Sequence, residues 1–382
     1  MKKLCVLGAT GSVGGATLAV VRHRRAHFAV TTLVADTDAA AMRKLCREFC
    51  PAWAVMRDEM AAEELTQMIR ADGSSTAVKG GASAVRDAPL GDCCTVVAAI
   101  SGAEGLSPTL AAVQAGRRVL LANKESLALA GGLLMAAARD SGATILPIDS
   151  EHAALFQLLG GSPAAAGDKL WLTASGGAFL SLPMAQLAEV TPTQALAHPT
   201  WSMGAKITVD SATMMNKALE VIEATMLFAA AADSIGVVIH PQSIVHAMVE
   251  KSDGTLTAQL SMPDMRLPIA QMLAWPAEEA LMTLPRPSWA DLSGLTFAEP
   301  EAERYPCLQL AQDALAAGGA APGVLSAANE AAVARFLRGD IKFTDIARIN
   351  YAALAKHADC AADSLEDLLA ADRRARQWAA AA

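Results

Sequence analysis

Residues 207–224, ITVDSATMMNKALEVIEA, carry side chains that could bind a phosphate and a divalent cation together. We expect a short strand that ends at Val209, followed by a turn and a helix. The turn contains three residues of types that cap helices well, Asp210, Ser211 and Thr213. A helix N-terminus attracts anions, because its unpaired backbone N–H groups and its dipole both present positive charge. The start of this helix is therefore a candidate phosphate site.

The predicted helix adds an amide, a cation and a carboxylate. Asn216 and Glu220 are four residues apart and share one face, while Lys217 can lean toward a ligand at the helix start. Glu220 has the wrong charge for an anion and the right charge for a metal ion. The face that it shares with Asn216 favours it over Glu223 as a ligand. The alternative is a capped surface helix with ordinary polar residues.

A second acidic cluster, Asp149-Ser150-Glu151-His152, follows a predicted strand. In an extended backbone Asp149 and Glu151 point to one side, where two carboxylates repel each other unless a cation lies between them. Oxygen ligands suit Mg²⁺ or Mn²⁺ better than zinc. His152 could also bind the metal, although one histidine beside an acid pair is more often a supporting donor or a core residue. The alternative for the two acids is a capping box before a helix over 153–159.

The elements that must position these side chains begin with a strand at Lys3–Leu7. It runs directly into GATGSVG, residues 8–14, and then into an apolar-periodic helix. A strand, a glycine turn and a helix form the context of dinucleotide binding, because the glycines let the backbone approach a pyrophosphate. An ordinary turn between a strand and a helix is the alternative.

Strands and helices continue to alternate, which indicates a doubly wound parallel sheet. Further strands are expected at Ala29–Ala35, Ala52–Met56, Thr95–Ile100, Arg118–Ala122 and Thr144–Ile148. In such sheets ligands bind at the carboxyl ends of the strands. The polar run Asn123-Lys124-Glu125 follows one of these ends, as the cluster at 149–152 follows another.

Asp36-Thr37-Asp38 follows the second strand. At this place a Rossmann-like domain distinguishes a ribose hydroxyl from a 2′-phosphate, and acidic side chains favour the hydroxyls of NADH. Asp38 could instead only cap the helix that begins at Ala39.

After Leu170 the pattern changes. Ser175-Gly176-Gly177 offers a hydroxyl and accessible N–H groups to a phosphate. Residues 191–206 indicate a lid, because this irregular run carries Trp201 and Met203, which could be buried on closure. Trp201 could equally be a core residue. Three later strands indicate an α+β region with sheet edges used for dimerisation, and from Tyr305 the pattern is that of a helical bundle.

Composition limits the function classes. The chain has 382 residues, 53% hydrophobic and 18% charged, which suggests two or three domains with sizeable cores. Its net charge of −8 argues against a general nucleic-acid or anionic-membrane surface. Seven scattered cysteines without a CxxC pair favour a reducing cytoplasm. No run reaches the roughly 18 apolar residues of a membrane span.

Taken together, the segments resemble the 1-deoxy-D-xylulose 5-phosphate reductoisomerase family. The resemblance follows nearly the whole chain in order. Its motifs are LGATGSVG (7–14), LLANKESL (120–127), PIDSEHAALFQ (147–157), TASGG (173–177), HPTWSMGAKITVDSATMMNKALEVIEA (198–224), IHPQSIVHAMV (239–249), PDMRLPIA (263–270) and ANEAAVARFL (328–337).

The resemblance implies an enzyme that rearranges 1-deoxy-D-xylulose 5-phosphate and reduces the product to 2-C-methyl-D-erythritol 4-phosphate for isoprenoid synthesis. It implies NADPH and a divalent cation (Mg²⁺, Mn²⁺ or Co²⁺), a cytoplasmic homodimer, and no nucleic-acid or membrane partner. The expected fold is α/β, with a Rossmann-like NADPH-binding domain at 1–149. An α+β catalytic and dimerisation domain at 150–274 has a lid at about 175–206, and a linker at 275–300 leads to a helical domain at 301–382.

Matching positions imply the site residues. The implied metal ligands are Asp149, Glu151 and Glu220, and Lys124 joins them as a catalytic residue. The implied substrate contacts are Lys124, Ser150, Glu151, Ser175, His198, Trp201, Met203, Ser211, Asn216, Lys217 and Glu220. The implied cofactor contacts are Thr10, Gly11, Ser12, Val13, Asp36, Thr37, Asp38, Asn123, Glu125 and Gly204.

Two segments depart from the family pattern. Residues of the Gly-Lys-Asn kind are usual where this chain has Asp36-Thr37-Asp38, and proline is usual at Ala178. We predict that NADPH is used with an unusually small preference over NADH, measurable as steady-state specificity constants.

Two other functions compete with this interpretation. A metal-independent dehydrogenase of the aldehyde-phosphate type needs a cysteine or histidine at a strand end, and none is evident. A nucleotide-binding sensor or scaffold should have lost the carboxylates at 149, 151 and 220, which are all present.

Overall fold

The computed structural model describes residues 1–201 and 203–382. The chain divides into two compact units. The first consists of Met1–Ser126, Gly132–Asp149 and Met265–Leu284, and the second of Leu127–Gly131, Ser150–Asp264 and Pro285–Ala382. Within the described ranges, no helix combines the length and the apolar character that a membrane crossing needs.

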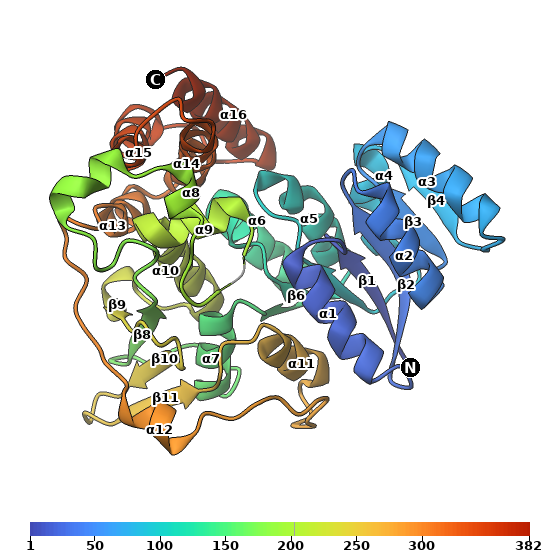
Figure 1. The fold of residues 1–382 in the computed structure, drawn as a ribbon, viewed down its shortest axis with the longest axis horizontal. Helices are drawn as coiled ribbons and strands as arrows, with labels where there is room; N and C mark the ends of the chain where they lie inside the picture. The colour runs from blue at the N-terminus through green and yellow to red at the C-terminus, as the bar shows by residue number, and fades with distance from the viewer. Residues whose placement is uncertain (202) are drawn as a thin grey trace. The chain divides into compact units, whose positions relative to one another are not determined.

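The first unit is built on a seven-stranded sheet with the order β4-β3-β2-β1-β5-β6-β7 (Figure 1). All neighbouring strands are parallel. The strands are β1 (Lys2–Leu7), β2 (Phe28–Ala35), β3 (Trp53–Met56), β4 (Ala77–Gly80), β5 (Thr95–Ala98), β6 (Arg118–Leu121) and β7 (Thr144–Pro147). The chain leaves β1 first to one side and then to the other, so the strand order reverses beside β1. The expected Rossmann-like parallel sheet is confirmed.

The helices of the first unit connect these strands. They are α1 (Ser12–His23), α2 (Ala39–Phe49), α3 (Glu59–Ala71), α4 (Ala82–Asp87), α5 (Leu106–Gln114), α6 (Lys124–Ser141, in which 127–131 count with the second unit) and α11 (Arg266–Ala274). A Cβ on Gly14 would lie 2.2 Å from Gly8 O, so only glycine lets α1 start this close to the turn. Helix α11 packs on α1, and Lys2 Nζ donates to Leu273 O at 3.1 Å.

The second unit contains a four-stranded sheet with the order β11-β10-β8-β9. Its strands are β8 (Lys169–Ala174), β9 (Ile235–Ile239), β10 (Val245–Glu250) and β11 (Leu256–Leu260). Strand β10 is antiparallel to β8 and β11, whereas β8 and β9 are parallel. Helix α7 (Ser150–Leu158) packs on β10, and α10 (Met215–Phe228) packs on β8 and on α13 (Cys307–Ala317). Leu172, Leu219 and Phe228 belong to the core that joins these elements.

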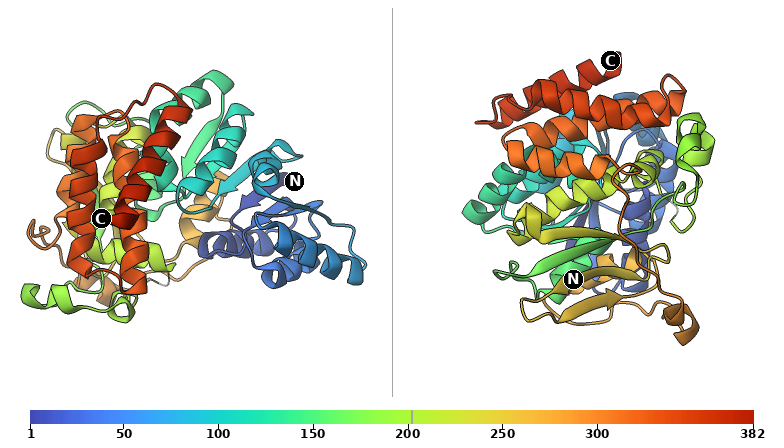
Figure 2. Two further views of the ribbon diagram at one scale, coloured as in Figure 1. Left: turned by 90° about the horizontal axis from the view of Figure 1, so that it is seen from above. Right: turned by 90° about the vertical axis from the view of Figure 1, so that its left-hand side faces the viewer.

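The C-terminal part of the second unit is helical, as the sequence predicts. Its helices are α13 (Cys307–Ala317), α14 (Ala321–Arg338), α15 (Phe343–His357) and α16 (Leu365–Ala381). Helix α14 packs against both α15 and α16 (Figure 2). A buried chain of polar side chains connects this bundle to the middle of the unit. Asn350 Nδ2 donates to Asn329 Oδ1 at 3.0 Å, and Asn329 Nδ2 donates to Asp210 Oδ1 at 2.7 Å.

The strand expected at 207–209 is wrong. These residues lie inside the helix α9 (Ala205–Thr213), and α10 begins only after Met214, whose φ of 61° is left-handed. The β-branched residues of this segment favour a strand locally, but Val209 is fully buried in a cluster with Phe336 and Ile346. Helical packing against the C-terminal bundle overrides the local preference. Asp210 and Ser211 therefore do not cap a helix start.

The extended backbone expected at Asp149 and Glu151 is also wrong. Helix α7 begins at Ser150, three residues earlier than predicted, so Glu151 lies in its first turn. Lys124 is the first residue of α6. Strand β4 was not predicted at all, because its four residues include Lys79 and a glycine and lie at the sheet edge.

Candidate active site

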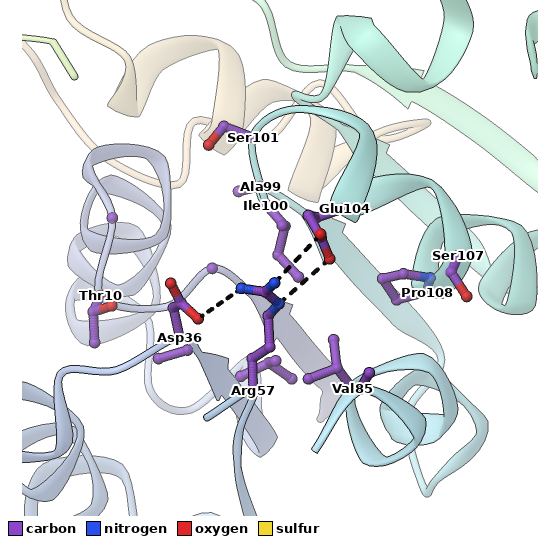
Figure 3. Close-up of a pocket in the computed structure, with 15 residues that line it drawn as sticks. Thr10, Asp36, Arg57, Val85, Ala99, Ile100, Ser101, Glu104, Ser107 and Pro108 are labelled. Atoms are coloured by element: carbon purple, nitrogen blue, oxygen red, sulfur yellow. Dashed lines mark hydrogen bonds and ion pairs between the residues drawn. The ribbon is translucent and has the colours of Figure 1, made fainter. Parts of the chain in front are cut away.

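A crevice of about 330 Å³ lies in the first unit at the carboxyl ends of its strands (Figure 3). Gly8, Asp36, Arg57 and Ala99 line it, and each directly follows one of the strands β1, β2, β3 and β5. A doubly wound sheet binds its ligands at this edge, beside the point where the strand order reverses. The crevice is therefore the candidate dinucleotide site.

The structure brings only some of the predicted cofactor residues to this crevice. Thr10, Gly11 and Asp36 line it. Asp38 caps α2, because its carboxylate accepts a hydrogen bond from the backbone of Ala41 at 2.8 Å. The capping alternative for Asp38 is confirmed. Ser12, Val13, Thr37, Asn123, Glu125 and Gly204 are not among the lining residues of the crevice.

The side chain of Asn123 forms hydrogen bonds with the surrounding backbone. Its Oδ1 accepts from Ser126 N at 2.6 Å and caps α6, while its Nδ2 donates to Gly102 O at 2.9 Å. These bonds hold the loop after β5 against the start of α6. Glu125 follows in the first helical turn and is buried.

Lys124 and Asp149 lie at the ends of neighbouring strands. Leu121 and Pro147 are partners in the parallel pairing of β6 and β7, and each strand is followed within a few residues by one of the two charged side chains. Lys124 Nζ lies 2.6 Å from Asp149 Oδ2. Lys124 is 5% exposed, so this ion pair is largely screened from water. The two polar clusters that the sequence places at strand ends meet here.

Asp149, Glu151 and Glu220 each offer a carboxylate oxygen, and these oxygens lie within 4.8 Å of one another. Glu151 comes from the first turn of α7, and Glu220 from the second turn of α10. Asn216 Nδ2 donates to Glu220 Oε1 at 2.5 Å, so the shared helix face predicted for these residues is confirmed. A set of three carboxylates is a donor set that a hard divalent cation prefers.

Lys217 supplies positive charge to this cluster. Its Nζ lies 2.6 Å from Glu220 Oε2 and 2.5 Å from Glu151 Oε1. Burial disfavours its charged form, but the two carboxylates outweigh burial and hold the pKa of Lys217 above its ordinary value. The lysine remains charged and offsets part of the repulsion between the acids.

His152 and Glu223 form a second buried pair behind these carboxylates. His152 Nδ1 lies 3.6 Å from Glu223 Oε2, and its Nε2 lies 2.9 Å from the backbone oxygen of Glu220. Its ring stacks on Phe228 at 6.2 Å between centroids. Ligand atoms of Asp149, His152 and Glu223 also lie within 4.8 Å of one another, so these residues form a second group that could hold a metal ion. The bond to the backbone of Glu220 makes His152 a support of α10, the role that the sequence favours.

Ser175, His198 and Ser211 converge in the second unit. His198 Nε2 lies 3.0 Å from Ser175 Oγ and 3.2 Å from Ser211 Oγ. His198 Nδ1 accepts from the backbone N–H groups of Thr200 at 3.1 Å and Trp201 at 2.9 Å. Because Nδ1 accepts, the proton of the neutral ring is assigned to Nε2. The group thus presents three hydrogen-bond donors in one place.

Burial lowers the pKa of His198 below its usual value of 6.5. The imidazole is therefore neutral at pH 7 before an anion arrives. A phosphate placed beside it would meet three hydrogen-bond donors, namely the hydroxyls of Ser175 and Ser211 and the Nε2–H group of His198.

The loop that carries Ser175 is fixed by close contacts. Gly177 has a φ of +71°, and a Cβ there would lie 2.5 Å from Ala212 Cα. The Tyr305 hydroxyl donates to Gly176 O at 3.0 Å. Gly177 packs directly on α9, and the Ser175 hydroxyl lies 3.5 Å from the Ser211 hydroxyl of that helix.

The expected lid at about 175–206 includes Ser202, which lies outside the described residues. Trp201 and Met203 on either side of it are half-buried. Gly204 precedes α9 as its N-cap, and its carbonyl accepts from Thr208 Oγ1 at 2.8 Å.

Sequence comparisons agree with the order of these elements. Profiles described as 1-deoxy-D-xylulose 5-phosphate reductoisomerase, its C-terminal domain, and the DXP reductoisomerase C-terminal domain match residues 4–131, 145–228 and 260–378. A protein named 1-deoxy-D-xylulose 5-phosphate reductoisomerase from Cupriavidus metallidurans is 52% identical over 388 residues, covering 100% of this chain and 98% of that protein. The chain belongs to the 1-deoxy-D-xylulose 5-phosphate reductoisomerase family.

Other reductoisomerases are similarly close. The one from Ralstonia pickettii is 50% identical and covers 99% of this chain and 96% of its own length. A crystal structure of DOX-P reductoisomerase in complex with NADPH, fosmidomycin and magnesium has a TM-score of 0.94 at 40% identity, covering 100% and 98% of the two chains. The Zymomonas mobilis reductoisomerase in complex with NADPH has a TM-score of 0.90 at 40% identity, with the same coverage.

Sequence reasoning missed Arg57 and Glu104, which both line the crevice in the first unit. Arg57 follows β3 directly, so a complete ordering of the predicted strands would have placed it at the ligand edge. Glu104 lies in a short 3₁₀ turn, Ala103–Gly105, after β5. Its position depends on how that loop folds, and no spacing rule indicates it.

Proposed function

We propose that this chain catalyses the NADPH- and divalent-metal-dependent rearrangement and reduction of 1-deoxy-D-xylulose 5-phosphate to 2-C-methyl-D-erythritol 4-phosphate. The reaction would serve non-mevalonate isoprenoid synthesis. The observation that supports this most directly is the convergence of the carboxylates of Asp149, Glu151 and Glu220 in a member of this family.

The proposed metal fits the residues present. Three carboxylates offer oxygen atoms within 4.8 Å of one another, and such oxygen-only donors suit Mg²⁺ or Mn²⁺. Relatives have been crystallised with magnesium. When bound, a divalent cation supplies Lewis-acid polarisation of a carbonyl oxygen, and NADPH supplies the hydride.

The lysines give the site fixed positive charge. Lys124, held by Asp149, would stabilise negative charge that develops on the oxygens of the substrate. Lys217 would keep Glu151 and Glu220 oriented through its two short ion pairs. Both ammonium groups are buried, so water screens their effect little.

The phosphate of the substrate would bind to Ser175, His198 and Ser211. The two hydroxyls and the Nε2–H group lie 3.0–3.5 Å from one another. A phosphate could replace their mutual hydrogen bonds and accept from all three donors. A DOX-P reductoisomerase structure contains fosmidomycin. Binding the phosphate away from the reacting carbons would help close the segment that carries Trp201 and Met203.

The same proposal covers the arrangement of the chain. Residues 1–149 would bind NADPH, 150–274 would bind the substrate and form a homodimer, and 301–382 would follow a linker as a helical domain. We place the enzyme in the cytoplasm.

The test is the loss of NADPH absorbance with 1-deoxy-D-xylulose 5-phosphate, measured with and without EDTA. We expect turnover that EDTA abolishes and added Mg²⁺ or Mn²⁺ restores. Turnover that is insensitive to EDTA would favour a metal-independent dehydrogenase. No turnover with any divalent cation would favour a nucleotide-binding protein without chemistry.

A further inference from the structure

Arg57 and Asp36 are neighbours because of the strand register. Ala35 pairs with Met56 at the ends of the parallel strands β2 and β3, and Arg57 N continues the ladder by donating to Ala35 O at 2.9 Å. The next residue of each strand is therefore placed side by side at the carboxyl edge of the sheet. Arg57 Nη1 lies 3.4 Å from Asp36 Oδ1 (Figure 3).

The same guanidinium also contacts Glu104. Its Nε lies 3.3 Å from Glu104 Oε2 and its Nη2 lies 3.3 Å from Glu104 Oε1, from the opposite side of the crevice (Figure 3). One cation thus spans two carboxylates. Arg57 is the only basic side chain among the described residues that line this crevice.

The contacts of Arg57 with Asp36 and Glu104 are weak enough for a ligand to replace them. The side chains of Arg57, Asp36 and Glu104 are 47%, 62% and 64% exposed, and all three distances are long for charge-assisted hydrogen bonds. Exposed ion pairs of this kind contribute only about 0–1 kcal/mol. A phosphate dianion could take over the guanidinium, because arginine binds phosphate oxygens through its planar fork.

The crevice without Arg57 would repel a phosphate. Asp36 follows β2, at the position where a doubly wound domain meets the ribose of a dinucleotide. Its carboxylate favours hydroxyl groups, and Glu104 adds a second negative charge across the crevice. A 2′-phosphate needs a compensating cation, and neither residue 37 nor residue 38 is basic.

We propose that Arg57 determines specificity for the 2′-phosphate of the adenine dinucleotide, as the cation that binds it and offsets Asp36 and Glu104. The proposal rests on the proposed function, since it concerns how that enzyme selects NADPH. Asp36 and Glu104 hold the guanidinium over the crevice, and when a dinucleotide binds, the guanidinium turns to the phosphate. Asp36 then opposes Arg57, which keeps the preference for NADPH small.

The test measures dissociation constants of NADPH and NADH by calorimetry on the full chain without substrate. In Arg57→Gln we expect NADPH binding to weaken by about tenfold or more, with NADH binding changed by less than about threefold. Asp36→Asn should strengthen NADPH binding. Arg57→Lys keeps the charge but lacks the fork, so it should give an intermediate loss. Arg70→Gln, on the exposed end of α3 and away from the crevice, is the matched control.

Equal weakening of both dinucleotides in Arg57→Gln, or no change in either, would overturn the inference. So would a wild-type chain that binds neither dinucleotide. Because no sugar phosphate is present, the measured dissociation constants do not depend on whether the chain catalyses the proposed reaction. A chain that binds NADPH through Arg57 but does not convert the sugar phosphate would contradict the proposed reaction and support the role of Arg57.

Discussion

Lys217 Nζ lies 2.6 Å from Glu220 Oε2, one turn away on the same helix, and 2.5 Å from Glu151 Oε1 on another helix. A single ammonium group therefore joins α10 to α7 through their acidic side chains. The lysine is 3% exposed and Glu220 is 1% exposed, so this ion cluster is sheltered from solvent. Removing one partner of such a cluster would leave charge in a poorly solvated place.

Replacing Glu220 by glutamine should abolish turnover and leave dinucleotide affinity nearly intact. The amide keeps an oxygen for Asn216 but removes one of the three carboxylates that could bind a cation. The crevice lined by Thr10, Gly11 and Asp36 does not include Glu220. Turnover, NADPH affinity and Mn²⁺ affinity are the measurements.

Glu223→Gln is the comparison for that experiment. Glu223 belongs to the alternative metal group with His152 and Asp149. If Glu223→Gln removes Mn²⁺ binding and Glu220→Gln does not, the assignment of the metal ligands is wrong.

Replacing Lys217 by methionine should destabilise the protein by about 3–5 kcal/mol, because it removes the ammonium group that contacts the buried Glu220 and the half-buried Glu151. Added Mg²⁺ should recover more stability in this variant than in the wild type, since an ion can take over the neutralising role. Urea unfolding with and without Mg²⁺ measures both effects. Lys251→Met, which breaks an ion pair with Asp168, is the control, and Mg²⁺ should leave its stability unchanged relative to the wild type. An equal gain from Mg²⁺ in both variants would contradict the idea.

The stability of the protein should fall as the pH falls below 6.5, in part because of His198. Burial lowers the pKa of His198 in the folded chain, so the unfolded chain takes up this proton at higher pH. The contribution is fully present above the unfolded value of 6.5 and is lost as the pH falls toward the folded value. Protonation would also remove the acceptor for the N–H groups of Thr200 and Trp201.

The measurement is the free energy of unfolding against pH for the wild type and His198→Asn. The wild type should lose more stability than the variant between about pH 7.5 and pH 5.5. Parallel curves would show that His198 does not titrate in this window.

The sequence was sufficient for the elements whose local signals agree with their packing. The strand Lys3–Leu7 was predicted from its apolar run and the helix after it from apolar periodicity, and the structure has both, with the helix beginning at Ser12 inside the glycine-rich segment 8–14. The pairing of Asn216 with Glu220 followed from helical periodicity alone. The placement of Lys124 and Asp149 at the ends of strands followed from the alternation of strands and helices, whereas their contact depends on the pairing of β6 with β7.

The errors lie where distant contacts decide the conformation. Ile207 and Val209 favour a strand, yet burial of Val209 against the C-terminal bundle makes the segment helical. Asp38 was ambiguous between a ligand contact and a helix cap, because both roles use a carboxylate at a strand end. Arg57 directly follows a predicted strand, but its contact with Asp36 depends on the register of two strands, which a single sequence does not specify.

Replacing Gly177 by alanine should lower both stability and substrate affinity. The residue has a φ of +71°, and the new Cβ would lie 2.5 Å from Ala212 Cα and 2.7 Å from Ser211 O. The left-handed conformation alone costs about 1–2 kcal/mol for an alanine. The backbone clash would also push the loop away from α9 and separate Ser175 from Ser211. The expected result is a lower melting temperature and a higher KM for the sugar phosphate, with dinucleotide affinity unchanged.

Gly132→Ala is the matched control for Gly177→Ala. Gly132 lies in α6 with a negative φ and no atom within 4 Å of a new Cβ, so alanine there should stabilise the helix by up to about 1 kcal/mol. The two variants make the same chemical change in opposite backbone environments. A Gly177→Ala protein with wild-type melting temperature and KM would show that Gly177 does not hold Ser175 in place beside Ser211.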